Sequence, residues 1–166
     1  MYVGFNSVRS PTSAVLRKIE RLVRGKGVRR VIVDLRLNGG GDNTTYGSLT
    51  ALFGSKAVNK RGKLYLLVGR ATFSAAANFA AEIDRATRAV FVGEPTGGGV
   101  ETYGDRFPVL LPTVGWTVHI AARHHERKKS KNDRRLAVAP DVQIDLTSKQ
   151  YFAGQDPVLE RALAGL

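Results

Sequence analysis

Ser74 has both the side chain and the position that nucleophilic chemistry requires. It follows an apolar run at residues 64–68 that predicts a buried strand, and it precedes an alanine-rich run at residues 75–86 that predicts a helix. A hydroxyl at the start of a helix lies near the positive end of the helix dipole, which favours developing negative charge on oxygen. Serine is also a common N-terminal cap, so a purely structural role fits this position as well.

Three consecutive glycines, Gly39, Gly40 and Gly41, follow a second apolar run at residues 31–33. Their backbone N–H groups could form an oxyanion hole for acyl transfer, but an ordinary turn or a phosphate-binding loop would have the same composition. A dinucleotide-binding fingerprint is incomplete, because Thr44 stands at the place of its third glycine. Acyl transfer is therefore the reaction that these glycines and Ser74 could share.

A parallel sheet would bring these loops together. Apolar runs at residues 2–6, 31–33, 64–68 and 89–92 predict strands, and helical patterns separate them at residues 11–24, 43–53 and 75–86. This alternation predicts an α/β fold, with a mostly parallel sheet and crossover helices. Ligands bind beyond the carboxyl ends of such strands, so we expect the loops after three of the strands to meet there.

The second half of the chain has a different pattern. Residues 107–111 and 116–121 predict a β-hairpin, and residues 142–146 predict a last strand. Asp156 followed by Pro157 predicts the start of a terminal helix that ends near Leu163.

Composition restricts the possible classes of protein. The chain has 166 residues, of which 43% are hydrophobic and 24% charged, as expected for one globular domain. It has no cysteine, which excludes disulfides and a thiolate nucleophile, and no apolar run long enough to span a bilayer. We expect a soluble protein, with the bacterial cytoplasm and export both open as its location.

The net charge of +12 suggests an affinity for anions. Residues 123–135 hold seven basic and two acidic side chains but no aromatic one on which a base could stack. This predicts at most a weak, nonspecific association with nucleic acid or anionic surfaces.

Three segments resemble the signatures of the carboxyl-terminal processing (tail-specific) peptidases. They are residues 33–41 (VDLRLNGGG), residues 71–76 (ATFSAA) and residues 92–98 (VGEPTGG), and they occur in the order found in that family. Residues 140–141 and 156–159 are similar to the closing segments of the same family. The resemblance extends over nearly the whole chain and also includes the tricorn-core serine peptidases.

The resemblance implies a ClpP/crotonase-like fold, with Ser74 as the nucleophile and the N–H groups of Gly40 and Ala75 as oxyanion donors. Peptides or protein C-terminal segments would be cleaved through an acyl-enzyme, without a metal or other cofactor, and the chain could form a homo-oligomer. The positions that would contact substrate are Gly39, Gly41, Thr96, Gly97 and Gly98. Asp34 and Arg36 are expected to form a salt bridge that holds the glycine loop.

The resemblance fails at the general base. Gly99 stands where processing peptidases have a lysine, and no histidine precedes Ser74, where tricorn-like enzymes have theirs. We therefore expect residues 1–166 to form a single domain, the C-terminal part of a larger catalytic domain that lacks its N-terminal portion. The base would then lie outside this chain, and the isolated chain would have little or no activity.

Two alternatives remain open. His124 and His125 could supply a base locally, although a solvated, basic face is the simpler explanation of both. The chain could also be a non-catalytic module that binds a ligand or peptide on the same fold.

Overall fold

The computed structural model describes residues 1–11, 13–25 and 27–165, and it has two sheets. Five strands form a sheet in the order β1-β2-β3-β4-β7, and every neighbouring pair in it is parallel. The other two strands form an antiparallel hairpin, β5–β6. The elements are β1 (Tyr2–Gly4), α1 (Ser13–Arg24), β2 (Val31–Asp34), α2 (Gly47–Gly54), β3 (Leu64–Val68), α3 (Ala75–Ala86), β4 (Val90–Gly93), β5 (Glu101–Leu111), β6 (Trp116–Glu126), β7 (Val142–Gln143), α4 (Ser148–Phe152) and α5 (Pro157–Ala164).

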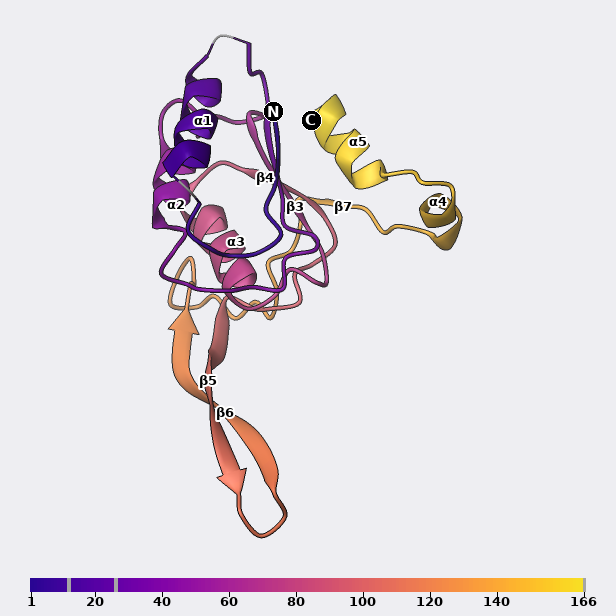
Figure 1. Cartoon of the computed structure of the whole chain (residues 1–166). Coiled ribbons are helices and arrows are strands. Elements are labelled where there is room, and N and C mark those ends of the chain that lie inside the picture. Colours follow the sequence, from indigo (N-terminus) through magenta and orange to yellow (C-terminus); the bar gives the residue numbers. More distant parts are fainter. Residues whose placement is uncertain (12, 26, 166) are drawn as a thin grey trace.

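The sheet is covered on both faces, as its continuous apolar strands require. Helices α1, α2 and α3 lie on one side of the sheet and α5 lies on the other (Figure 1). Alternate residues of each central strand enter two separate clusters: Leu64 and Leu66 pack with the three helices, whereas Tyr65 and Leu67 pack with α5. The predicted α/β class with crossover helices is confirmed.

Several predicted boundaries were wrong by a few residues, for local reasons. Helix α2 begins at Gly47 because the preceding polar residues bond to one another: Asp42 accepts hydrogen bonds from the backbone and hydroxyl of Thr44. Helix α1 begins at Ser13 rather than at Pro11, and Thr12 between them lies outside the described residues. The short helix α4 was missed, although a capping box formed by Thr147 and Gln150 marks its start.

The hairpin β5–β6 is much longer than predicted and extends away from the rest of the molecule (Figure 1). Its base, where Glu101 pairs with Glu126, continues directly from the loop that follows β4. The strands were not predicted near this base, because its charged residues do not show the alternation of apolar and polar side chains that is typical of a half-buried sheet. Among the residues that the structure describes, no helix has both the length and the apolar character to cross a membrane.

Candidate active site

Ser74 lies in a strained turn between β3 and α3. Its φ and ψ are 53° and −128°, a conformation that residues other than glycine rarely adopt. Ser74 occupies the N-cap position of α3, but its side chain makes no capping hydrogen bond. The hydroxyl therefore does not perform the structural role that its position would permit. A serine held exposed on a sharp turn between strand and helix is typical of a nucleophile.

Two buried polar residues fix this turn. The Thr72 hydroxyl donates a hydrogen bond to the Leu35 carbonyl at 2.8 Å and accepts one from the Gly69 N–H. Asn38 is fully buried, and its backbone carbonyl accepts a hydrogen bond from the Phe73 N–H at 3.1 Å. The turn at Ser74 is thus tied to the residues that end β2, which also begin the glycine loop.

Gly40 brings that loop against Ser74. A Cβ atom at Gly40 would lie 2.7 Å from the Cβ of Ser74. The φ of Gly40 is +116°, which is unfavourable for residues other than glycine. The Gly40 N–H donates to the Oδ1 of Asn38 at 3.0 Å, so this predicted oxyanion donor already has an acceptor. The Ala75 N–H, at the first residue of α3, has no acceptor within the described part of the chain. Ala75 is therefore the better placed of the two predicted donors.

The positions predicted to contact substrate differ in accessibility. Thr96 is buried, and its hydroxyl donates to the Gly98 carbonyl and accepts from the Val138 N–H, so it holds the loop together. Gly98 packs beside Ser74, since a Cβ there would lie 3.6 Å from the Ser74 nitrogen and 2.8 Å from the Ala77 Cβ. The remaining three glycines are at exposed positions: Gly39, Gly41 and Gly97.

Gly99 leaves no space for the lysine of the processing peptidases. A Cβ at this residue would lie 2.8 Å from the carbonyl oxygen of Leu136 and 3.1 Å from its carbonyl carbon. Backbone atoms cannot move aside as the end of a flexible side chain can. The backbone around residue 99 therefore packs too closely for a larger side chain, and a lysine at this position would require that backbone to shift.

A small cavity beside Ser74 contains a histidine from the hairpin. Its volume is about 50 Å³, and Asn78, Asp105 and His125 are among the residues that line it with Ser74. His125 is 6% exposed, and its Nε2 lies 3.4 Å from the Oδ2 of Asp105. Of the buried side-chain atoms in the described residues, His125 Nε2 and Asn78 Oδ1 are two that lack a hydrogen-bond partner.

The sequence could not select His125 over His124. Adjacent residues on a strand point to opposite faces, so one of the two had to face the helices, but the strand was predicted to end before either of them. His124 points to the other side, where its Nε2 lies 3.0 Å from Glu101 Oε1. Both histidines were expected on a solvated, basic face. This is correct for His124, which is exposed, and wrong for His125, which is buried. Asp105 and Asn78 were not singled out by the sequence at all.

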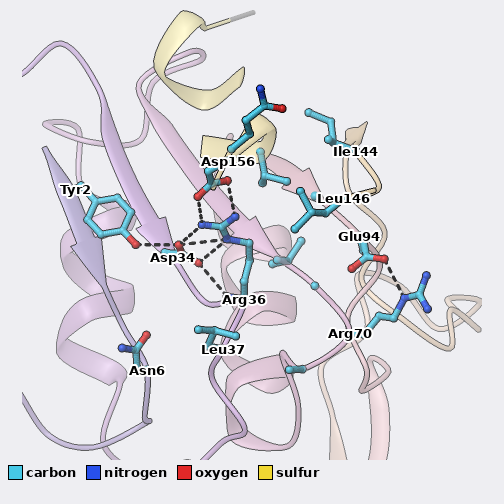
Figure 2. Close-up of a pocket in the computed structure, with 16 residues that line it drawn as sticks. Tyr2, Asn6, Asp34, Arg36, Leu37, Arg70, Glu94, Ile144, Leu146 and Asp156 are labelled. Atoms are coloured by element: carbon cyan, nitrogen blue, oxygen red, sulfur yellow. Dashed lines mark hydrogen bonds and ion pairs between the residues drawn. The ribbon is translucent and has the colours of Figure 1, made fainter. Parts of the chain in front are cut away.

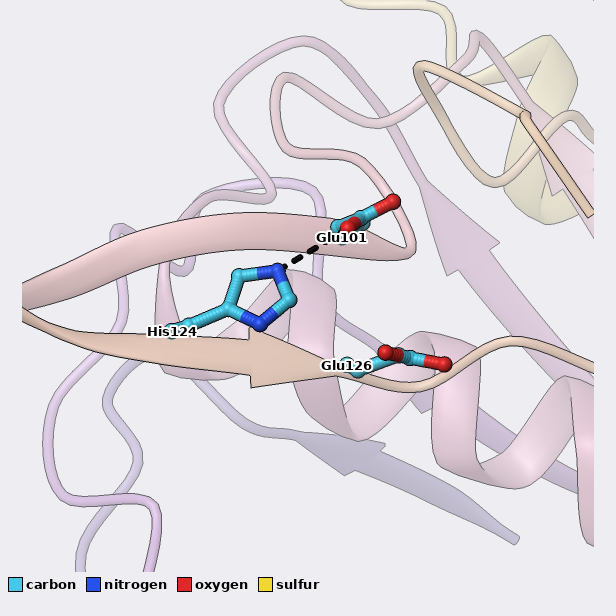
Figure 3. A group of neighbouring side chains, drawn as sticks. All are labelled: Glu101, His124 and Glu126. Carbon is cyan, nitrogen blue, oxygen red and sulfur yellow. Dashed lines mark hydrogen bonds and ion pairs between the residues drawn. The ribbon is translucent and has the colours of Figure 1, made fainter.

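His124 belongs to an exposed cluster with Glu101 and Glu126, whose potential metal ligands lie within 4.8 Å of one another (Figure 3). Pairing of β5 with β6 creates this cluster, which the sequence did not predict. The ammonium group of Lys128 lies 2.5 Å from Glu101 Oε2. Its hydrogen bond lowers the pKa of the Glu101 carboxyl. Lys128 therefore already supplies positive charge here, and we interpret the group as an ion-pair network.

A larger pocket, of about 570 Å³, opens on the face of the sheet that α5 covers (Figure 2). Arg36 forms ion pairs of 2.7 Å with both Asp34 and Asp156, and the Tyr2 hydroxyl donates to Asp34 at 2.8 Å. The predicted pairing of Asp34 with Arg36 is thereby confirmed, and Asp156 extends it. The hydrogen bond from Arg36 lowers the pKa of the Asp156 carboxyl.

The basic segment at residues 123–135 is largely neutralised by neighbouring acids. Five of its seven Lys and Arg side chains form ion pairs, including Lys129 with Asp84 at 2.6 Å. Paired cations contribute less to binding of a polyanion than free ones do. Association with nucleic acid or anionic surfaces stays a prediction, which this pairing weakens.

The chain resembles a known peptidase family in sequence. The model of peptidase family S41 matches residues 45–144, which include Ser74, β4 and the hairpin. A comparison with curated protein sequences found no match.

Solved structures of proteases share its fold at low sequence identity. The photosystem II D1 C-terminal processing protease is 23% identical, with a TM-score of 0.59, over 87% of this chain and 42% of its own. A protein from Parabacteroides merdae is 19% identical, with a TM-score of 0.71, over 98% of this chain and 59% of its own. The tricorn protease is 20% identical, with a TM-score of 0.59, over 98% of this chain and 17% of its own. This chain thus spans less than two thirds of each of these structures.

Proposed function

Because the chain belongs to peptidase family S41, we propose that it carries the nucleophile of a serine peptidase, which cleaves peptide bonds through an acyl-enzyme on Ser74. The observation that carries this proposal is the backbone of Ser74. A positive φ of 53° at a residue without a capping role is costly, and such strain is kept at sites where function requires it. The hydroxyl is exposed at the carboxyl end of the sheet, where α/β folds bind their ligands.

The proposed reaction uses groups that surround this hydroxyl. The Ser74 oxygen attacks the carbonyl carbon of the scissile bond, and the negative charge that develops on the carbonyl oxygen is stabilised by the Ala75 N–H. Gly40 contributes its N–H as the second donor by sharing or releasing its hydrogen bond to Asn38. The amine product leaves with a proton, and water then hydrolyses the ester to release the acid and restore Ser74.

The substrates that we propose are peptides or the C-terminal segments of proteins. The fold shared with a C-terminal processing protease and with tricorn protease supports this class. Gly39 is exposed and a Cβ there would meet nothing within 4 Å, so this position leaves room for a substrate backbone. At Gly41 and Gly97 the missing Cβ instead makes room for the backbone of Val8 and of Arg70. Residues 1–166 would form one domain within a larger catalytic unit, because the similar structures are all longer. Assembly into a homo-oligomer is part of the same proposal.

Hydrolysis of an unstructured protein, with and without the Ser74→Ala substitution, tests this function. We expect Ser74→Ala to lower the cleavage rate by at least about 10³-fold, as removal of a nucleophile does. Ser48→Ala, an exposed serine of α2, is the matched control and should leave the rate unchanged. Cleavage that persists in the Ser74→Ala protein would contradict the proposal.

A second candidate function is binding without catalysis. The observation that favours it is Gly99, around which the backbone leaves no space for a lysine base. In that case an unstructured peptide would bind equally well to the wild-type and Ser74→Ala proteins and would be recovered intact from both. Calorimetry combined with mass analysis of the peptide separates this outcome from turnover.

A further inference from the structure

We infer that His125, held by Asp105, is the general base that removes the proton of Ser74, so that the base lies within this chain. This inference rests on the proposed function of Ser74 and adds the group that activates it. It replaces the expectation, drawn from the sequence, that the base lies outside residues 1–166.

The first argument is placement. His125 lies on β6, far from Ser74 in sequence, yet both side chains line the same cavity of about 50 Å³. Both side chains therefore border the same space, and a group held in it would meet both of them.

The second argument is the unsatisfied ring. His125 is 6% exposed, and its buried Nε2 has no hydrogen-bond partner in the described ranges. Leaving a buried polar atom unpaired costs about 1–3 kcal/mol, so such atoms are rare without a functional reason. Asn78, one turn along α3 from Ser74, presents a second unpaired oxygen to the same cavity. Asn78 Oδ1 is therefore available to a reacting group, whereas His125 Nε2 faces the carboxylate of Asp105.

The third argument is strain at Asp105. Residues 103 and 105 of a regular strand would face the same side as His124, away from His125. Asp105 instead has a positive φ of 51°, and its Oδ2 lies 3.4 Å from His125 Nε2 and 3.5 Å from Arg123 Nη1. The contact is close enough for an ion pair but is not aligned as a hydrogen bond. The backbone thus bears a cost that brings this carboxylate to the buried histidine.

Together these groups complete the chemistry. As the Ser74 oxygen bonds to the carbonyl carbon, the hydroxyl proton moves to the ring nitrogen of His125 that does not face Asp105. Asp105 stabilises the imidazolium that forms. When the carbon–nitrogen bond breaks, His125 gives the same proton to the leaving amine. His125 then takes a proton from the attacking water and returns it to Ser74. These reaction steps require no lysine at residue 99.

The test compares the rates at which a fluorophosphonate probe labels three forms of the folded chain: wild type, His125→Gln and His124→Gln. A general base contributes about 10²–10⁴-fold, so we expect His125→Gln to label at least about 100-fold more slowly. His124→Gln, its exposed neighbour on the opposite face, should label within about twofold of wild type. Melting temperatures confirm that both variants are folded.

Equal labelling of His125→Gln and wild type at Ser74 would overturn this inference and leave Ser74 as the nucleophile. Absence of any label on Ser74 in the wild-type chain would overturn both the inference and the proposed activation of Ser74. These failures are therefore distinguishable.

Discussion

The two cavities at the carboxyl end of the sheet differ in how their polar groups are satisfied. The larger one, about 570 Å³, contains Asp34, Arg36 and Asp156, and Arg36 forms ion pairs of 2.7 Å with both carboxylates. The smaller one, about 50 Å³, contains His125 and Asn78 with unpaired buried atoms. Ser74 and Asp105, the residues other than glycine with a positive φ in the described part of the chain, both border the smaller cavity.

This difference favours the smaller cavity as the site of the proposed chemistry. A side chain whose hydrogen bonds are all made within the protein has little left with which to act on a ligand, and its role is to hold the fold. Unpaired polar atoms and strained residues cost stability, and such costs are often found at functional sites. Among the described residues, Tyr46 and Ser55 also have an unpaired buried oxygen outside the smaller cavity, so what distinguishes this cavity is the combination of unpaired atoms with strained backbones. Volume alone would have selected the larger pocket, whereas the state of the polar groups selects the smaller one.

Gly40→Ala should lower the labelling of Ser74 more than Arg36→Met or Gly99→Lys does. The added methyl group would lie 2.7 Å from the Ser74 Cβ at a backbone with φ of +116°, so the loop must move away from the nucleophile. We expect labelling of Ser74 by a fluorophosphonate to fall at least about 100-fold, comparable to the loss of an oxyanion donor. Gly47→Ala is the control, because a Cβ there meets no atom within 4 Å. Equal labelling of the two variants would contradict the close approach.

Arg36→Met should affect stability and leave chemistry intact. It removes the partner of Asp34 and Asp156, and loss of one member of a partly buried ion network should cost about 2–3 kcal/mol in the free energy of unfolding. Urea denaturation measures this change, with Arg70→Met as the exposed control. Labelling of Ser74 in the folded fraction should stay within about twofold of wild type. A large loss of labelling would show that the two cavities are not separate in function.

Gly99→Lys should fail to create the base of the processing peptidases. The new Cβ meets the Leu136 carbonyl at 2.8 Å, so we expect a loss of about 1–3 kcal/mol in stability and no gain in the labelling rate of Ser74. Thermal denaturation and probe labelling check both parts. Gly54→Lys, where a Cβ meets nothing within 4 Å, is the matched control. Faster labelling of Gly99→Lys would contradict the packing described here.

Acid should weaken the larger cavity by a small amount. The Asp156 carboxyl has a lowered pKa in the folded chain, chiefly because of its hydrogen bond from Arg36. Its contribution to stability is therefore complete above the ordinary aspartate pKa and is lost as the pH falls through the lowered value. Asp156 is more than a third exposed, so we expect less than about 1 kcal/mol. Denaturation between pH 2 and pH 6 should show a weaker pH dependence for Asp156→Asn than for wild type, and equal slopes would contradict the assignment.

The parallel sheet could be predicted from sequence because its strands are short, apolar and separated by helices with clear patterns. Residues 64–68 and 75–86, predicted as strand and helix, are β3 and α3 with the same bounds. Ser74 could be selected because it stands between them and within a motif that the processing peptidases share.

The rest of the candidate site depends on contacts that no local pattern encodes. The hairpin β5–β6 places His125 and Asp105 at the cavity that Ser74 also lines, and its polar base does not alternate as a strand buried on one face would. The reorientation of Asp105 depends on a single positive φ, which a residue type alone does not predict. The hydrogen bond from Gly40 to Asn38 is likewise visible only once the loop is folded.

Mass spectrometry of the fluorophosphonate adduct tests the central claim most directly. The folded wild-type chain would be incubated with the probe and digested, and the modified peptide would be sequenced. The account predicts one adduct, on the Ser74 oxygen, and none on the Ser74→Ala protein. Recovery of the Ser74 peptide without modification from folded wild-type protein would contradict it.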